Sequence, residues 1–215
     1  MIAPTNKDMH VSEALIHALA NGEGLGKIVK NINGVDHWFP YKGKKDAPDV
    51  WTVGHGHVCR TPKELEFYRK NGVTAAQAMD LLRLDVATRF ENELKKYWPL
   101  ITVQHEFDSI VSFSYNNGNG PMIEHDRSLS NALKTRDRKK IAASFLEYVC
   151  SGKPAIMVRG LIYRRLEEAH WYYYGQLVIA RTIPKAVALL DKMIADGILN
   201  KTARYNRIRD LKWIG

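Results

Sequence analysis

Apolar residues recur at the spacing of an α-helix from early in the chain. A helix is expected over residues 11–20, because Val11, Leu15 and Leu19 share one face, and Asn21-Gly22 is expected to end it. The pattern then changes, and residues 34–57 are rich in Gly, Pro, Asp and aromatic side chains. This region predicts an irregular β-hairpin containing short extended pieces such as residues 50–53.

The rest of the chain has helical periodicity. Thr61-Pro62 is typical of a helix start, and Gly72 is expected to end that short helix. Thr74 is expected to cap a long helix that runs until Pro99 stops it. A further helix around Phe107 ends at residues 117–118, and others are expected near residues 128–134, 139–149, 159–174 and 183–199.

The elements together predict an α+β protein that is predominantly α, with one small β element near the N-terminus. Gly175 is the expected boundary between a main domain, residues 1–175, and a basic amphipathic helical extension, residues 176–215. Such a segment can lie on anionic membranes, lipopolysaccharide or wall polymers. The alternative is a pair of helices packed on the main domain, and it is favoured because amphipathicity mostly reports packing.

Composition narrows the class of protein. Hydrophobic residues make up 45% of the 215 residues, which is enough for a core and speaks against disorder. No apolar run approaches the roughly 18 residues that a membrane span needs, and no basic segment followed by an apolar one opens the chain. We therefore expect no secretory signal, and accumulation in the cytoplasm of the cell that makes the protein. The net charge of +9 suits a polyanionic partner, although general solubility explains it equally well.

The two cysteines, Cys59 and Cys150, are expected to be free thiols, because two cysteines do not make a disulfide scaffold and the cytoplasm is reducing. They do not combine with histidines at metal-ligand spacing. No structural zinc, no other metal and no cofactor is therefore predicted.

The densest group of reactive side chains lies in and just before the β region. Glu23 follows a helix end, Asp46 and Asp49 lie in a loop, and Thr52 lies in a predicted strand. Hydrolysis of a glycosidic bond needs one group that protonates the leaving oxygen and another that activates water. The negative end of a helix dipole favours the protonated form of a carboxyl group, which suits a general acid. Each residue alone has an ordinary structural explanation, so the hypothesis depends on their order and spacing.

These residues and four later segments resemble the phage-type lysozymes of glycoside hydrolase family 24. That family opens with a helix ending in Glu-Gly, as in Glu23-Gly24, and continues with Trp-Thr-Ile-Gly-x-Gly-His, as in residues 51–57 (WTVGHGH). Residues 104–118 resemble its F-x-x-L-v-S-F-x-F-N-x-G helix, Ser128-Leu129 its Ser-Thr-Leu segment, and residues 160–168 its G-L-x-x-R-R-x-x-E helix. The resemblance covers residues 11–175 and implies a lysozyme-like fold with a small β-hairpin lobe and a helical lobe.

The resemblance also implies a function and site residues. The substrate would be the β-1,4 bond between N-acetylmuramic acid and N-acetylglucosamine in peptidoglycan, cut with inversion, with Glu23 as general acid and Thr52 helping to hold the water. The two carboxyl groups would then lie roughly 6.5–9.5 Å apart. Asn116 and Arg165, within two of the motifs, are expected to bind substrate. The protein would be a monomer whose partner is peptidoglycan, with no specific nucleic acid. It would stay in the host cytoplasm until its release to the periplasm and cell wall.

The second carboxylate is the point at which this chain departs from the family pattern. Many members carry the Asp two residues after a Tyr, where this chain has Gly43, and others carry it six residues before the Thr, which is Asp46. The loop between Glu23 and Thr52 is also longer than usual. We assign Asp46, with Asp49 as the reserve and Asp36 as a distant third.

Three further interpretations concern side chains near this group. In the family the histidine at position 57 forms a buried ion pair with an Asp on the long helix, here Asp85, and we expect that structural role rather than a metal site. One of Arg164 and Arg165 would hydrogen-bond Glu23 and position it, although for either arginine taken singly a solvated helix face is favoured. The aromatic side chains of residues 38–41 would stack on sugars or, more ordinarily, form a small core.

Two other functions compete with hydrolysis. A lytic transglycosylase on a lysozyme-like fold works with one Glu and no water-activating Asp, and Gly43 keeps this alternative open. A non-catalytic basic module that binds cell wall or nucleic acid would have no lytic activity to lose on Glu23→Gln.

Overall fold

The computed structural model describes residues 4–42, 49–200 and 208. The chain divides into two compact units. The small unit is His10–Asn92, and the large unit joins Met1–Met9 to Glu93–Gly215. The assigned second carboxylate, Asp46, lies outside the described residues.

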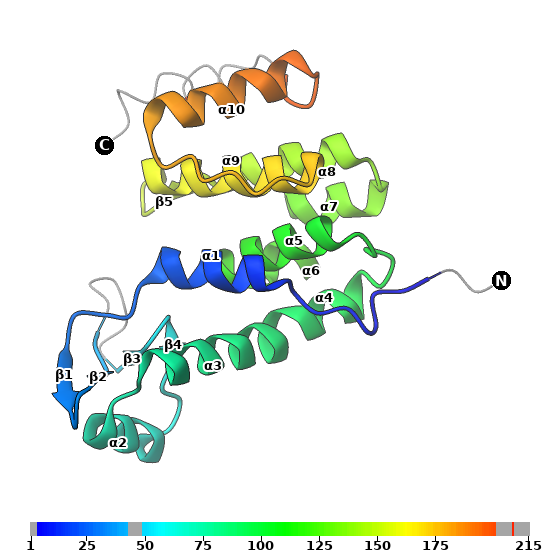
Figure 1. The fold of residues 1–215 in the computed structure, drawn as a ribbon. Helices are drawn as coiled ribbons and strands as arrows, with labels where there is room; N and C mark the ends of the chain where they lie inside the picture. The colour runs from blue at the N-terminus through cyan, green and yellow to red at the C-terminus, as the bar shows by residue number, and fades with distance from the viewer. Residues whose placement is uncertain (1–3, 43–48, 201–207, 209–215) are drawn as a thin grey trace. The chain divides into compact units, whose positions relative to one another are not determined.

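The small unit combines short strands with helices (Figure 1). Its elements are α1 (Glu13–Glu23), β1 (Val29–Ile32), β2 (Val35–Trp38), β3 (Thr52–Val53), β4 (His57–Val58), α2 (Pro62–Asn71), α3 (Ala75–Asp85) and a π-helical segment (Val86–Glu91). β1 pairs with β2 and β3 with β4, both antiparallel. Contacts of α3 with β2 and β4 hold the strands against that helix.

The large unit is almost entirely helical. Its elements are α4 (Asn92–Tyr97), which starts at the boundary, α5 (Gln104–Asn117), α6 (Gly120–Ile123), α7 (Ser128–Thr135), α8 (Arg138–Phe145), a 3-10 turn (Leu146–Tyr148), β5 (Cys150–Ser151), β6 (Ile156–Met157), α9 (Arg159–Tyr174) and α10 (Ile183–Ala195). The α+β, predominantly helical class predicted from the sequence is confirmed. The short elements α6, β5 and β6 were not predicted, because two to four residues show no periodicity.

The first helix is longer than the sequence analysis predicted. Ser12 caps α1, whose helical conformation continues through Asn21 and Gly22 to Glu23, so the expected end at Asn21-Gly22 is wrong. The helix ends where Gly24 adopts a φ of 70° and donates its N–H to the carbonyl of Ala20 at 3.0 Å. Glycine reaches this conformation without a Cβ clash, and the glycine after Glu23 therefore sets the helix end.

The β region also begins earlier than predicted. The tight turn of the first hairpin is Asn33-Gly34, with φ values of 52° and 84°, which belong to the turn that matches strand twist. β1 therefore starts at Val29, before the expected boundary at residue 34. All four residues of β1 are exposed, and an exposed strand lacks the alternating burial that sequence patterns detect.

The predicted start and end of α2 and the predicted start of α3 are confirmed. Thr61 accepts a hydrogen bond from the N–H of Glu64, Gly72 closes α2, and Thr74 forms a capping box with Gln77 at the start of α3. The predicted long helix up to Pro99 is not uniform, because residues 86–91 form a π-helical segment between α3 and α4. The apolar positions of this stretch repeat every four residues, which fits an ordinary α-helix equally well, so the sequence did not show the π-helical segment.

The core of the large unit lies around α5 and α9. Phe107, Ile110, Val111 and Ser114, the predicted inner face of α5, are all buried, and α5 and α8 both pack against α9. α10 lies along α9, at the top of Figure 1, and buries an apolar face consisting of Ala186, Leu189, Leu190 and Met193. The described part of the extension therefore follows the packed alternative. α10 ends at Ala195 rather than at residue 199, although Leu199 is also buried.

Both cysteines are free thiols, as predicted, and burial raises the pKa of Cys59 to about 11. Within the described ranges, none of the helices is both long enough and apolar enough to cross a lipid bilayer.

Candidate active site

Glu23 occupies the last position of α1, and its side chain is exposed. Gly24 follows it in a conformation that turns the chain away from the helix axis. Glu23 therefore lies at the carbonyl end of the helix, where the dipole disfavours a negative charge, as the sequence analysis expected of a general acid.

The segment after Glu23 packs against the strand that carries Thr52. At Gly26, with a φ of 86°, an added Cβ would lie 2.7 Å from the Tyr41 ring, so only glycine allows this approach. Tyr41 and Thr52 in turn exchange two backbone hydrogen bonds, of 2.8 and 2.9 Å. These contacts connect the Glu23 segment to Thr52 within the small unit.

A second connection runs through the small apolar core. Leu25 packs against the buried cluster of Val53, Val73 and Ala78. Val53 follows Thr52 directly, so the residues next to the two proposed catalytic side chains share one core. Gly54 makes this packing possible, because a Cβ there would lie 2.9 Å from the Cβ of Ala78.

His55 gives a third connection, which the sequence analysis missed. Its side chain is buried and lies within hydrogen-bonding reach of the backbone of Ala20, in the last turn of α1, and of Gly24, which follows the helix. Burial lowers the pKa of His55, while these hydrogen bonds and the charge of Glu23 oppose that effect. His55 is the variable residue of the Gly-x-Gly-His motif, and its place in that motif was the only sequence signal that pointed to it.

The structure places the candidate aspartates only in part. Asp49 is exposed in a turn, and Asp36 is exposed on β2, where it accepts a hydrogen bond from Asn31 at 2.9 Å. The assignment of Asp46 and the expected carboxyl separation stay predictions. Thr52 is buried at the start of β3.

The predicted pairing of His57 with Asp85 is confirmed. His57 Nδ1 lies 2.8 Å from Asp85 Oδ2, and both side chains are more than nine-tenths buried. The imidazole also has a partner that was not predicted, because Nε2 lies 3.0 Å from Glu64 Oε1 on α2. The hydrogen bond with Asp85 raises the pKa of His57 against the opposing effect of burial, with a further contribution from Glu64. His57 thus joins β4 to α2 and α3.

The two predicted substrate-binding residues meet in the large unit. Arg165 Nη2 donates to Asn116 Oδ1 at 3.1 Å, and Arg165 pairs with Glu168 at 2.9 Å. The side chain of Arg165 is fully buried, so the alternative of a solvated helix face is wrong for it, whereas Asn116 is exposed. Glu168 also accepts a hydrogen bond from Ser112, and the group ties α5 to α9.

The aromatic side chains before the site follow the small-core interpretation. Trp38 packs against the same cluster as Leu25, and Phe39 is buried. Tyr41 contacts Gly26, as described above.

Comparison with known proteins gives one family match. The family model described as phage lysozyme matches residues 39–168, which is more than half of the chain. The endolysin of Bacillus phage PZA is 30% identical over 170 residues, and the endolysin of Bacillus phage B103 is 27% identical over 170 residues. Both alignments cover 78% of this chain but 56% of the relative, so the chain spans little more than half the length of these curated relatives.

Solved structures share the fold, among them the two described next. An endolysin from Escherichia coli O157:H7 phage FAHEc1 aligns with a TM-score of 0.60 at 23% identity, covering 80% of this chain and 98% of that one. The muramidase domain of SpmX from Asticaccaulis excentricus aligns with a TM-score of 0.56 at 22% identity, covering 76% and 97%. The lysozyme-like fold predicted from the sequence is therefore confirmed.

Proposed function

The chain belongs to the phage lysozyme family, and on that premise we propose that it hydrolyses the β-1,4 bond between N-acetylmuramic acid and N-acetylglucosamine in peptidoglycan. Its similarity to phage endolysins further supports a role in host-cell lysis.

In the proposed reaction, Glu23 donates a proton to the glycosidic oxygen as the bond to the anomeric carbon breaks. A water molecule attacks that carbon from the opposite face, and a carboxylate of the loop before Thr52 takes up the proton that the water loses. Thr52 helps to hold the water. Attack from the opposite face inverts the anomeric configuration.

The observation that supports this assignment is the set of contacts between the Glu23 segment and the Thr52 strand. Gly26 packs on Tyr41, Tyr41 pairs with Thr52, and Leu25 shares a core with the neighbouring Val53. A general acid needs a defined position relative to the group that activates water, and contacts of this kind supply it.

The first test is a turbidity or zymogram assay on purified peptidoglycan. Glu23→Gln is expected to lower turnover by about a hundredfold or more, the scale of a lost general acid. Glu66→Gln, an exposed glutamate on α2, is the matched control and is expected to keep wild-type turnover. Full activity of Glu23→Gln would refute the assignment of the acid.

The products separate hydrolysis from the transglycosylase alternative. Mass spectrometry of the cleaved glycan is expected to show the mass of one added water at each cut. Anhydro-sugar ends, formed without added water, would identify the activity as that of a lytic transglycosylase instead of a hydrolase. NMR of the freshly formed reducing end, before mutarotation, is expected to show the α-anomer from the β-linked substrate.

A pair of variants tests the second carboxylate. We propose Asp46, so Asp46→Ala is expected to abolish turnover while Asp49→Ala retains most of it. The reverse result would assign Asp49 instead and leave the role of Glu23 unaffected.

A further inference from the structure

A cavity of about 520 Å³ opens in the large unit, and all of its lining residues belong to that unit. It lies between the loop of residues 97–101 and the α7, α8 and α9 helices. The volume falls within the range of about 300–1,000 Å³ that is usual for small-molecule sites. None of its residues takes part in the proposed hydrolysis.

The interior of the cavity is apolar and partly aromatic. Leu133, Ile141 and Tyr172 form buried parts of the wall, and Trp98 and Leu100 line the more accessible side. Leu100 is 46% exposed, which places apolar surface in contact with water at the opening. Such a surface gains free energy when a hydrocarbon group covers it.

Hydrogen bonds hold the loop side of the cavity in place. Asn6, which is fully buried, donates its backbone N–H to the carbonyl of Pro99 at 2.8 Å and its side-chain amide to the carbonyl of Trp98 at 3.0 Å. The indole Nε1 of Trp98 donates to the carbonyl of Met122 at 2.9 Å. A wall held in this way requires little reorganisation when a ligand binds.

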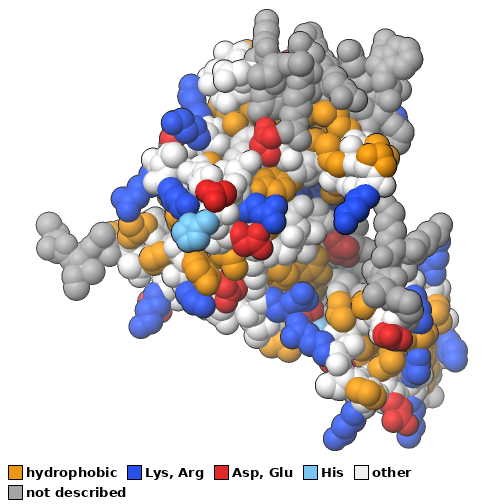
Figure 2. All heavy atoms as spheres, turned by 180° about the vertical axis from the view of Figure 1, so that it is seen from behind, with side chains coloured by type: hydrophobic (Ala, Val, Ile, Leu, Met, Phe, Trp, Pro, Cys, Tyr) orange, Lys and Arg blue, Asp and Glu red, His pale blue; other side chains and the backbone are white. Residues whose placement is uncertain are grey.

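The rim of the cavity is cationic. Lys134, Arg136 and Arg138 alternate along the α7–α8 connection and all line the opening, while Glu106 is the one carboxylate among the residues that line it. Arg138 Nε lies 2.6 Å from Glu106 Oε1, so that carboxylate is already paired. Two of the three cations are left without a carboxylate among the lining residues. On the face drawn in Figure 2, Lys and Arg side chains are interspersed with Asp and Glu.

Arg136 adopts an unusual backbone conformation for its residue type. It ends α7 with φ 56° and ψ 14°, in the left-handed region where glycine is the usual residue. A non-glycine residue here costs stability, and such strain persists where the side chain serves another purpose. The Arg136 side chain lines the cavity.

We propose that this cavity binds an anionic amphiphile with a single hydrocarbon chain. The chain would cover Leu100, Trp98 and the buried wall, and the anionic headgroup would contact Lys134 and Arg136. A neutral sugar would leave the two cations without an anion, and a free inorganic anion would leave the apolar wall exposed. The combination of both features in one cavity favours a ligand that carries both groups.

The binding test uses dodecyl phosphate below its critical micelle concentration, measured by calorimetry on the full chain. Inorganic phosphate and dodecanol, each carrying one half of the chemistry, are expected to bind at least about tenfold more weakly than dodecyl phosphate. Equal binding of inorganic phosphate would reduce the site to an anion site and overturn the proposal. If N-acetylglucosamine oligomers bound preferentially, and the variants described below weakened that binding, the cavity would be a glycan subsite and the proposal would be overturned.

Arg136→Gly is the most informative variant because stability and binding should change in opposite directions. Removal of the charge is expected to weaken dodecyl phosphate binding about fivefold or more. Glycine relieves the left-handed strain, so Tm is expected to rise or stay constant. Unchanged affinity would overturn the proposal, and the stability measurement excludes misfolding as the cause of a loss.

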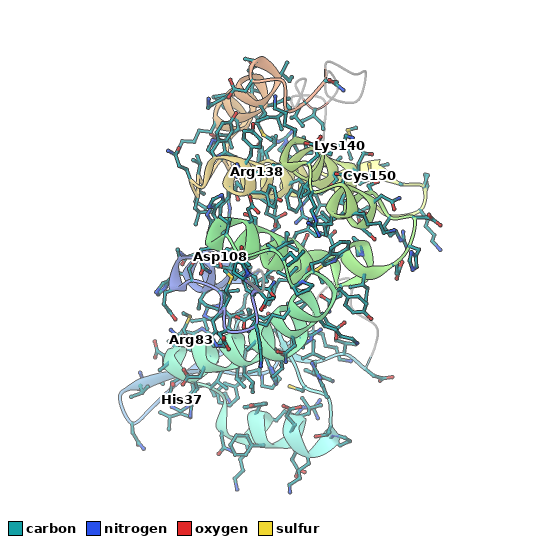
Figure 3. The ribbon with its side chains drawn as sticks, turned by 90° about the vertical axis from the view of Figure 1, so that its right-hand side faces the viewer. His37, Arg83, Asp108, Arg138, Lys140 and Cys150 are labelled. Carbon is teal, nitrogen blue, oxygen red and sulfur yellow. The ribbon has the colours of Figure 1, made fainter. Side chains whose placement is uncertain are left out.

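Two matched controls locate the site. Lys140, two residues beyond Arg138 on α8, lines a different depression, and Lys140→Ala is expected to leave affinity unchanged (Figure 3 labels both residues). Leu100→Ala is expected to weaken binding, whereas Leu84→Ala, on α3 and 56% exposed, is not. Equal effects of a test variant and its control would indicate nonspecific adsorption and refute the assignment to this cavity.

Discussion

The interaction of His57 with two carboxylates predicts a large and pH-dependent contribution to stability. His57 reaches Asp85 at 2.8 Å and Glu64 at 3.0 Å, so one imidazole links β4 to the two helices that follow it. Asparagine has a similar shape and supplies one amide donor group, but it carries no charge and cannot reach in both directions. His57→Asn therefore removes the charge interaction and one of the two hydrogen bonds.

The expected magnitude follows from burial. Asp85 is 5% exposed, and removal of one partner of a buried ion pair costs about 3–5 kcal/mol. Two guanidinium groups moderate that cost, because Arg60 and Arg89 each lie 3.9 Å from Asp85 Oδ1. We therefore expect His57→Asn to lower the free energy of unfolding by about 2–3 kcal/mol, and Tm by about 5–10 °C for a chain of this size.

The direction of the pH dependence follows from the pKa shifts of His57 and Glu64. The pKa of His57 is raised from 6.5, so its contribution is complete below pH 6.5 and declines as pH rises through the raised value. Burial raises the pKa of Glu64, but the hydrogen bonds with His57 and Arg60 outweigh this effect, so the net pKa is lowered from 4.5. The contribution of Glu64 to stability is therefore complete above pH 4.5 and declines as pH falls through the lowered pKa. The difference in the free energy of unfolding between wild type and His57→Asn should therefore be largest between pH 4.5 and pH 6.5.

The assay is urea unfolding of wild type and His57→Asn at pH 5.5, 7 and 9, with turnover on peptidoglycan measured at a temperature where both are folded. His17→Asn is the control, because His17 is 68% exposed and its ion pair with Glu13 is long at 3.9 Å. The reasoning would be refuted by equal stability of His57→Asn and wild type at pH 5.5, by a difference that grows with pH, or by lost turnover with full stability.

Two further predictions concern a glycine and a buried charge. Gly26→Ala should lower turnover on peptidoglycan several-fold, because its Cβ would displace the Tyr41 ring. Gly34→Ala is the control, since Gly34 has a similar φ of 84° and open space around it. It should cost comparable backbone strain, about 1 kcal/mol, and keep normal turnover. Equal turnover of the two variants would show that the contact with Tyr41 does not position the site. Arg165→Met should lower the free energy of unfolding by about 3 kcal/mol or more at high pH, because it removes the cation that pairs with the buried Glu168. Burial already raises the pKa of Glu168 to about 7, so the loss relative to the wild type should widen as pH rises above that value; a pH-independent loss in chemical denaturation would contradict this.

Helix starts and stops were the most predictable part of the fold. Thr61, Thr74 and Gly72 were assigned as caps from their neighbours alone, and the structure confirms all three. A cap satisfies hydrogen bonds within three or four residues, so the information is local. The same locality explains the error at α1, where Asn21 and Gly22 are weak helix formers but the Gly24 turn and the buried residues of α1 carry the helix to Glu23.

For the site, the sequence suggested which residues to consider but not how they are surrounded. The pairing of His57 with Asp85 was expected from the family resemblance, whereas Glu64 was not, because it comes from the next helix. His55 was likewise invisible as a neighbour of α1. These contacts join segments separated by many residues, and no spacing rule relates them.

By itself, the sequence determined most of the longer helical segments, the caps of α2 and the N-cap of α3, the presence of a small β region and the order of the candidate catalytic residues. Each of these depends on periodicity or on hydrogen bonds between near neighbours along the chain. Only the tertiary structure decided that Arg165 is fully buried beside Glu168, that Gly26 contacts Tyr41, and that an apolar cavity with a cationic rim opens beside α8. The physical reason is that burial, ion pairing and cavity shape depend on which distant surfaces come together, and that information is absent from any short stretch of chain.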